Sequence, residues 1–392
     1  MVAEVQEIRR SFWRGRTVEV LASSRDRVLS PEENCPGCDW GYFELSAARE
    51  AKRALFLETM QRIGKIPAGA FGDLPIAPSP LAYRIRNRFH LSGRGTELVL
   101  GQFAARTHRV ETVAGCRALS EPTSAMLPAV AEALAATGAA VSELATLEDR
   151  AGGKRLARAA LSDGPKRQLR SDAEAVLGAL APLFAGVKVV DFEGRFLREA
   201  GEPRLEIHAG GRPFLVSVDT FFQGNRHLAE RLLADVEEAS GLPAADALDA
   251  FGGVGFFTAA LLAAGHGVVS VEGSPSAARD AAMTRLAWPD ADRWKILPSS
   301  VAGFLSASPA RFELVVADPP RAGLAGIARP LAARARKRFV YVSCDPATLA
   351  RDLPEVLAEG FEITGARLYD LFPLTHRVEA VVALARGARR TA

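Results

Sequence analysis

The C-terminal half of the chain alternates between short apolar runs and helical patterns. Runs typical of buried parallel strands cover Gly267–Glu272, Phe312–Ala317 and Phe339–Val342. A helical pattern over 347–358 follows Asp345 and Pro346, an N-cap residue and a proline at the first helical position. Strands that alternate with helices predict a doubly wound α/β domain over 226–392. Two last apolar runs, at 361–371 and 378–385, predict an antiparallel extension of its sheet.

The N-terminal half has a more mixed pattern. It contains a charged amphipathic helix at 44–63, a strand-rich stretch at 81–116 and an Ala-rich helix at 124–140. A mixed stretch with Gly and Pro breaks at 145–217 and a linking helix at 225–241 follow. We therefore expect a central α+β region at 31–225. Residues 1–30 are expected to form a shortened N-terminal β segment.

Composition and charge limit the class of protein. The chain has 392 residues, of which 48% are hydrophobic, which is enough for two to three domain cores. No long apolar run or signal-peptide pattern occurs, and four cysteines do not make a disulfide framework, so we expect a cytoplasmic protein without a membrane span. A net charge of +3 is too small to indicate nucleic acid. Any affinity for RNA must come from local clusters, of which the best places Arg84, Arg86 and Arg88 on one face of a strand.

Cys344 is the most informative single side chain. It follows the strand at 339–342 and precedes the helix at 347–358. Because unpaired amides and the helix dipole stabilise a thiolate at such a place, we expect a nucleophilic cysteine with a lowered pKa. A buried apolar cysteine at the end of a strand is the alternative.

A glycine turn indicates a nucleotide cofactor. Gly253 lies in the turn Asp249-Ala-Phe-Gly-Gly-Val-Gly255, between a strand and an apolar helix, and lets the backbone approach a ligand. Glu272 ends the next strand 23 residues after Asp249, close to the spacing of a ribose-binding acid. This pattern alone fits a dinucleotide or S-adenosylmethionine. Asp249 and the missing third glycine of G-x-G-x-x-G favour S-adenosylmethionine.

The order of five motifs resembles that of the S-adenosylmethionine-dependent RNA 5-methyluridine methyltransferases. These motifs are Asp219-Thr-Phe-Phe-Gln-Gly-Asn225, the glycine turn, Asp318-Pro-Pro-Arg-Ala-Gly323, Ser343-Cys-Asp-Pro346 and Phe372-Pro-Leu-Thr-His-Arg-Val-Glu379. The resemblance implies a Rossmann-like class I methyltransferase domain behind an RNA-recognition region, with Cys344 as nucleophile and Glu379 as base. It also implies cofactor contacts from Gln223, Phe251, Phe256, Glu272, Ser300 and Asp318. Phe256 stands where a polar residue is common, so a side-chain hydrogen bond is lost there.

The chemistry that the resemblance implies needs these residue types. A thiolate adds to C6 of uracil so that C5 can attack a methyl group, and a carboxylate then removes the C5 proton. We expect a monomer that methylates C5 of a uridine in structured RNA, with rRNA favoured over tRNA as the partner. A cytosine-5 methyltransferase usually shows Pro-Cys or a second cysteine near the site, and an exocyclic-amine methyltransferase wants an aromatic where Arg321 stands. A catalytically degenerate RNA-binding or assembly factor is the remaining alternative.

Three further cysteines match the family, and two positions differ from it. Cys35, Cys38 and Cys116 match three of the four cysteines that hold a 4Fe-4S cluster in many family members, and Leu29 stands at the position of the first. The resemblance therefore implies a possible 4Fe-4S cluster with an incomplete set of ligands. Arg377 replaces a histidine usual before the base, and His376 is its neighbour.

Overall fold

A largely parallel sheet forms the centre of the C-terminal half in the computed structural model, which describes residues 3–9, 12–17, 37–41, 43–104, 107–113 and 115–387. Its strands, in spatial order, are β15 (Trp294–Pro298), β14 (Gly267–Glu272), β13 (Asp246–Ala250), β16 (Phe312–Ala317), β17 (Ala335–Ser343), β19 (Glu379–Arg386), β18 (Phe361–Tyr369) and β3 (Ile76–Ala77). The five strands from β15 to β17 are parallel. From β13 the chain adds β14 and β15 on one side, and it then returns to the other side of β13 to add β16 and β17. Such a reversal is the place where open α/β sheets bind ligands.

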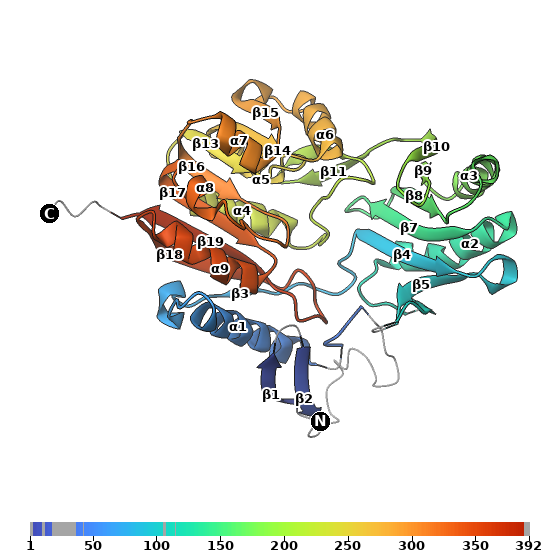
Figure 1. Ribbon diagram of the computed structural model, residues 1–392, viewed down its shortest axis with the longest axis horizontal. Coiled ribbons are helices and arrows are strands. Elements are labelled where there is room, and N and C mark those ends of the chain that lie inside the picture. Colours follow the sequence, from blue (N-terminus) through green and yellow to red (C-terminus); the bar gives the residue numbers. More distant parts are fainter. Residues whose placement is uncertain are drawn as a thin grey trace.

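Helices cover both faces of this sheet (Figure 1). One face packs on α4 (Ala229–Ser240), α5 (Phe256–Ala263) and α6 (Pro275–Leu286). The other packs on α1 (Leu45–Arg62), α7 (Val301–Ala307), α8 (Ala328–Ala332) and α9 (Pro346–Leu357). Neighbouring residues such as Val315 and Val316 belong to the two opposite cores, because side chains alternate along a strand. The doubly wound α/β fold is confirmed.

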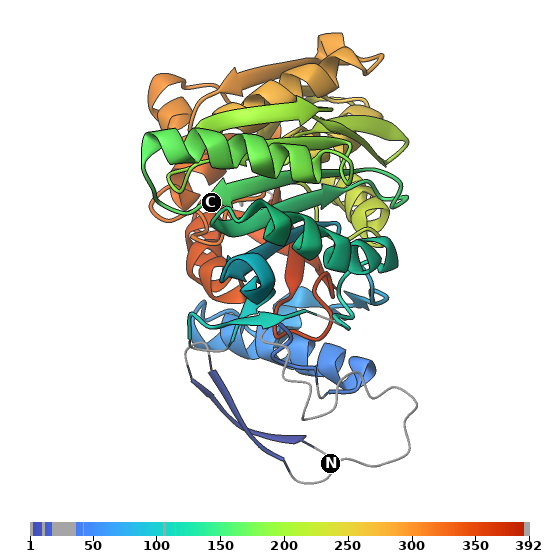
Figure 2. The ribbon, with the colours of Figure 1, turned by 90° about the vertical axis from the view of Figure 1, so that its right-hand side faces the viewer.

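Segments from the N-terminal half also join this unit. The antiparallel pairing of β17 with β19 and of β19 with β18 agrees with the predicted extension. Beyond it, β3 adds to β18 in parallel, with Leu368 opposite Ile76. Helix α1 packs against α9, and Figure 2 shows it beneath the last strands, next to the hairpin of β1 (Ala3–Arg9) and β2 (Phe12–Thr17). The boundary expected at residue 226 stays a prediction.

A second sheet follows in the central part of the chain. Its strands, in spatial order, are β10 (Phe196–Gly201), β9 (Gly186–Val190), β8 (Arg155–Leu161), β7 (Val141–Glu148), β4 (Arg86–Ser92), β5 (Val99–Phe103) and β6 (Val110–Thr112). Helices α2 (Glu121–Thr137) and α3 (Lys166–Leu180) supply one side of its core. The hairpin of β11 (Leu205–Ala209) and β12 (Arg212–Val216) instead packs in the core of α4 and α5. Short 3-10 turns lie at Ala68–Phe71, Gly95–Glu97 and Ala291–Arg293.

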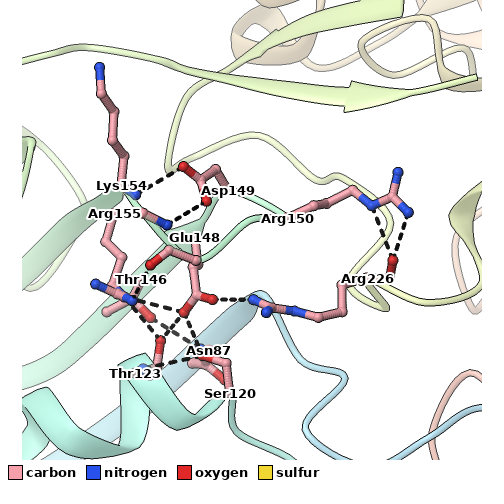
Figure 3. A network of polar contacts seen from close by, with 12 residues as sticks. Asn87, Ser120, Thr123, Thr146, Glu148, Asp149, Arg150, Lys154, Arg155 and Arg226 are labelled. Carbon is pink, nitrogen blue, oxygen red and sulfur yellow. Dashed lines mark hydrogen bonds and ion pairs between the residues drawn. The ribbon is translucent and has the colours of Figure 1, made fainter. Parts of the chain in front are cut away.

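A buried carboxylate connects the central sheet to the segment that enters α4. Glu148, at the end of β7, accepts hydrogen bonds from the Ser120 and Thr123 hydroxyls and pairs with Arg155 and Arg226 (Figure 3). Its side chain is fully buried, so each of its oxygens needs these partners. Arg226 lies just before α4 and thus ties the two units together. None of the helices in the described part of the chain has the length and apolar character that crossing a membrane requires.

Candidate active site

Several residues predicted to act in catalysis or to bind the cofactor lie along one edge of the parallel sheet. Phe251, Asp318 and Cys344 directly follow β13, β16 and β17, and Glu272 is the last residue of β14. Because these strands are parallel neighbours, their carboxyl ends meet at a single rim. Glu379 reaches the same rim from the opposite direction, since it opens the antiparallel strand β19.

The strand register brings Cys344 and Glu379 together. Ser343, the last residue of β17, pairs with Ala380 in the antiparallel ladder, so Cys344, which follows β17, and Glu379, which opens β19, flank this pair on the same side. The Glu379 side chain is buried and Cys344 is partly buried. A thiol and a carboxyl group thus lie at the same part of the rim.

The expectation of a lowered thiol pKa is wrong for the protein without RNA. The pKa of Cys344 is raised to about 12, first by burial and then by the negative charges of Glu379 and Asp318, while Arg321 opposes the change. The helix N-terminus does not compensate, because the Asp345 carboxylate already accepts hydrogen bonds from the backbone N–H groups of Ala347 and Thr348. The N-cap that starts α9 therefore uses the amides that were expected to stabilise the thiolate.

Two carboxyl groups at the rim are also shifted toward their neutral forms. Burial raises the pKa of Glu379 well above its usual range, and the charge of Asp318 adds to the shift, while Arg321 opposes it. The pKa of Asp318 is raised by burial and then by the charge of Asp249. Arg321 is thus a cation that lowers the pKa of both the Cys344 thiol and the Glu379 carboxyl group. The sequence pattern places Arg321 in the Asp-Pro-Pro-Arg motif but gives it no electrostatic role.

The glycine turn leaves polar groups ready for a ligand. The Glu272 carboxylate accepts a hydrogen bond from the backbone N–H of Gly253 at 2.8 Å. Asp249 is buried behind the turn, where one oxygen accepts from Thr258 at 2.6 Å and the other, Oδ1, has no hydrogen-bond partner among the described residues. Burial raises the pKa of Asp249 to about 7. An orphaned oxygen beside an open glycine turn fits a cofactor that donates hydrogen bonds.

Two of the expected cofactor residues have clear structural roles. The Phe256 ring is buried and packs edge-on against Phe222 and Phe257, so its side chain belongs to the core. Ser300 is the N-cap of α7, where its hydroxyl accepts from the backbone N–H of Gly303 at 3.0 Å. A direct contact of either side chain with a cofactor stays a prediction.

The Phe-Phe-Gln motif presents two different surfaces. Gln223 is buried and Phe222 packs in the core, whereas the side chain of Phe221 is 66% exposed. The segment is held from the central sheet, since the backbone N–H of Ile85 donates to the Gly224 carbonyl at 3.0 Å. The sequence does not distinguish Phe221 from Phe222, because burial of one phenylalanine and exposure of its neighbour depend on this tertiary contact.

The basic strand has the predicted alternation but a partly structural role. Arg84, Arg86 and Arg88 alternate with buried residues in and before β4. Arg86 donates to the backbone carbonyls of Thr220 and Val218, so it supports the segment before Gln223. Arg88 is the exposed member of the three. A role of this strand in binding RNA stays a prediction.

The cysteines predicted to hold a cluster are only partly described. Cys38 and Cys116 line one cavity of about 20 Å³, together with Arg84 and Asn87, and Cys35 lies outside the described residues. A cavity of this size holds roughly one water molecule. The described part of the chain contains no group of three or more His, Cys, Asp or Glu side chains suited to a metal ion. A 4Fe-4S cluster at these cysteines therefore stays a prediction from the resemblance.

The sheet and the residues at its strand ends define the class of protein. A parallel sheet with this order, a glycine turn after β13 and acids at the neighbouring strand ends define a class I methyltransferase. The solved structure of Pyrococcus abyssi tRNA (uracil-54, C5)-methyltransferase with S-adenosyl-L-homocysteine has the same fold, with a TM-score of 0.71 at 20% identity over 97% of this chain and 92% of that one.

Sequence comparisons add the family. The family model described as tRNA (Uracil-5-)-methyltransferase matches residues 305–387. An uncharacterized RNA methyltransferase of Streptomyces avermitilis is 30% identical, covering 96% of this chain and 88% of the relative. The 23S rRNA (uracil(1939)-C(5))-methyltransferase RlmD of a Shewanella species is 28% identical, covering 97% and 87%. The chain belongs to the family of S-adenosylmethionine-dependent RNA uracil-5 methyltransferases and is an enzyme.

Proposed function

We propose that this enzyme methylates C5 of a uridine in structured RNA, with Cys344 as the nucleophile and Glu379 as the base. The observation that carries the proposal is that a thiol just after β17 and a buried carboxyl group at the start of β19 flank the pair of Ser343 and Ala380. The reaction needs one group that adds to C6 and a second that removes a proton from the neighbouring C5. The two strand ends supply one of each.

The bond changes balance with these two side chains. The Cys344 thiolate forms a bond to C6, and the electrons of the C5–C6 double bond move toward O4, which makes C5 nucleophilic. C5 takes a methyl group that the bound sulfonium cofactor would supply, and the electrons of the broken sulfur–methyl bond would stay on the sulfur atom. Glu379 then accepts the C5 proton, the electrons of the C–H bond restore the C5–C6 double bond, and the S–C6 bond breaks to release the thiolate.

The rim has groups for both the cofactor and the target base. Residues that would hold the cofactor are Gln223, Phe251, Gly253, Glu272, Asp318 and, from the structure, Asp249. The exposed ring of Phe221 is a surface on which an unstacked base can pack. C5 of uridine is inaccessible in a stacked helix, so the target nucleotide must be drawn out of its stack.

An RNA of the ribosome is the proposed substrate. Support comes from the 28% identity over nearly the whole chain to a relative named as a 23S rRNA methyltransferase, whereas the tRNA enzyme resembles this chain in fold. Mapping 5-methyluridine by mass spectrometry in rRNA and tRNA of a strain without the gene tests this choice. Loss of a methyl group from tRNA alone would reject rRNA.

Replacing Glu379 by Gln tests the mechanism. The variant should form the thiol adduct and take the methyl group, because those steps need only the thiolate and the sulfonium, and then stall before release. We expect methylated RNA to remain bound to the protein in denaturing gels, with loss of tritium release from C5-labelled uridine. Cys344→Ala is the control and should form no adduct, even with 5-fluorouridine RNA, which has no C5 proton to remove. Normal turnover of Glu379→Gln would mean that another group is the base.

A further inference from the structure

The loop that precedes Glu379 is held by segments far away in the sequence. Residues 370–378 connect β18 to β19 and place Glu379 at the first position of β19. Their backbone carbonyls take hydrogen bonds from three different regions of the chain. The Asn225 side chain donates to the Leu371 carbonyl at 2.8 Å, and Lys52 Nζ donates to the Phe372 carbonyl at 3.1 Å. The backbone N–H of Trp40 donates to the Leu374 carbonyl at 2.8 Å.

Lys52 makes the most deeply buried of these contacts. Its side chain, on α1, is fully buried, and its ammonium group forms an ion pair with the Asp370 carboxylate at the start of the loop. Burial lowers the pKa of Lys52, while the charges of Asp370 and Asp39 oppose the change. A buried ion pair is weak support for stability by itself, because desolvation offsets much of the attraction. The ion pair lies at the start of the loop, so it fixes the position of Asp370 relative to α1.

The cysteine-bearing segment at 37–41 makes a second attachment. Asp39 accepts a hydrogen bond from the backbone N–H of His376 at 3.2 Å and pairs with Nδ1 of the same ring. Cys38 packs against Leu374 in a small apolar cluster. His376 is 43% exposed and engaged with Asp39, so it faces the 37–41 segment.

We propose that Lys52 and Asp39 are positioning residues that fix the loop at 370–378 and thereby aim the Glu379 carboxylate at the C5 proton. This inference rests on the proposed function of Glu379. The oxygen of a base must lie within about 2.6–3.2 Å of the atom that carries the proton, and a misplacement of about 1 Å can slow a reaction by roughly a hundredfold. Nine residues of irregular chain do not hold that geometry without anchors.

The test separates aiming of the base from general damage to the fold. Lys52→Met combined with Asp370→Asn removes both charges, so no unpaired charge is left buried. Asp39→Asn weakens the exposed attachment and leaves the core intact. Arg53→Ala is the matched control, because Arg53 is the next residue of α1, is 38% exposed and pairs with Glu50 on the same helix.

Two rates are compared for each variant. Adduct formation with 5-fluorouridine RNA reports the steps before proton removal, and tritium release from C5-labelled uridine RNA reports proton removal. We expect adduct formation within about twofold of wild type in all variants. Proton release should slow at least about tenfold in the double variant and about threefold in Asp39→Asn, with methylated RNA trapped on the protein, as a 1 Å misplacement allows. Arg53→Ala should behave as wild type.

Equal slowing of both rates would show a structural role only, and unchanged proton release in Asp39→Asn and in the double variant would reject the inference. Glu379→Gln is measured alongside. If it stalls while the loop variants do not, the positioning role fails and the base survives. If Glu379→Gln does not stall, the proposed base itself fails.

Discussion

At the residue scale, Cys344 shows how an N-cap can cancel the effect of the helix that it starts. The sequence places a thiol before a helix, which favours a thiolate. Asp345 occupies the N-terminal amides, and burial together with Glu379 and Asp318 raises the pKa of the thiol to about 12. The free enzyme therefore keeps this cysteine protonated near neutral pH. Attack on C6 then requires that RNA or cofactor binding, or a proton acceptor, shifts this balance.

A pH profile of thiol alkylation tests this account. Because the Glu379 carboxylate repels a thiolate and the Arg321 guanidinium attracts it, Glu379→Gln should lower the pKa of Cys344 and Arg321→Gln should raise it. Alkylation of the wild-type thiol by iodoacetamide should increase steadily with pH above neutrality, without a plateau below pH 9. At pH 8 we expect a several-fold faster reaction for Glu379→Gln and a slower one for Arg321→Gln. A plateau near pH 7 in the wild type would show a low pKa and contradict this account.

At the element scale, the bounds of two central parallel strands follow from the local sequence pattern, whereas the first residues of helices α2 and α4 do not. Strands β14 and β16 begin and end at the predicted residues, because each is an apolar run whose end is marked by a change to polar or glycine residues. Helix α2 begins at Glu121, three residues before the predicted start, because the Ser120 hydroxyl caps it. Helix α4 begins at Ala229, since Asn225 accepts from the backbone N–H groups before it and donates to Leu371.

The same limit applies to the candidate site. The strand ends that carry Glu272, Asp318 and Cys344 were predicted from runs of apolar residues, because parallel strands align their ends. The contact of Lys52 with Asp370 joins positions 318 residues apart, and no local pattern encodes it. Long-range pairing of this kind appears only when the helices have packed.

Two glycines of the turn after β13 should respond differently to substitution by alanine. Gly255 has φ 93°, and a Cβ there would lie 2.4 Å from the Trp294 ring, so Gly255→Ala should lower the free energy of unfolding by about 3 kcal/mol. Gly253 also has a positive φ, of 55°, but a Cβ there meets no atom within 4 Å. Gly253→Ala should cost about 1–2 kcal/mol and weaken S-adenosylhomocysteine binding at least tenfold.

Thermal unfolding and calorimetric titration of the two variants measure these effects separately. If Gly253→Ala loses as much stability as Gly255→Ala and binds S-adenosylhomocysteine as tightly as the wild type, the turn does not face the cofactor.

At the scale of the whole molecule, the central sheet and the methyltransferase unit share both apolar and polar contacts. Ile85 and Leu147 of the central region belong to the same core as Val316 and Val340 of the parallel sheet. The Phe-Phe-Gln segment and the loop at 370–378 lie where the two units meet, and Asn225 touches both. The site thus depends on how the two units are held, in addition to the rim of one sheet.

Glu148 offers a direct test of that dependence. In Glu148→Gln the side chain keeps its shape but loses its charge, which leaves Arg155 and Arg226, each about one-seventh exposed, without their buried counter-ion. Removing one partner of a buried ion pair costs about 3–5 kcal/mol, so thermal unfolding should begin at a clearly lower temperature. Since Arg226 connects β7 to the segment entering α4, we expect the wild type to unfold in one transition and Glu148→Gln in two. S-adenosylhomocysteine should raise only the midpoint of the unit that contains the parallel sheet.

The matched control is Glu230→Gln, which weakens the 52% exposed partner of Arg150 at the same junction and should cost less than about 1 kcal/mol, because exposed ion pairs contribute little. Calorimetry with and without S-adenosylhomocysteine distinguishes the outcomes. If Glu148→Gln unfolds in one transition that the cofactor shifts as in wild type, and loses no more stability than Glu230→Gln, the buried carboxylate does not couple the units. The apolar core that Ile85 shares with the parallel sheet would then hold them together by itself.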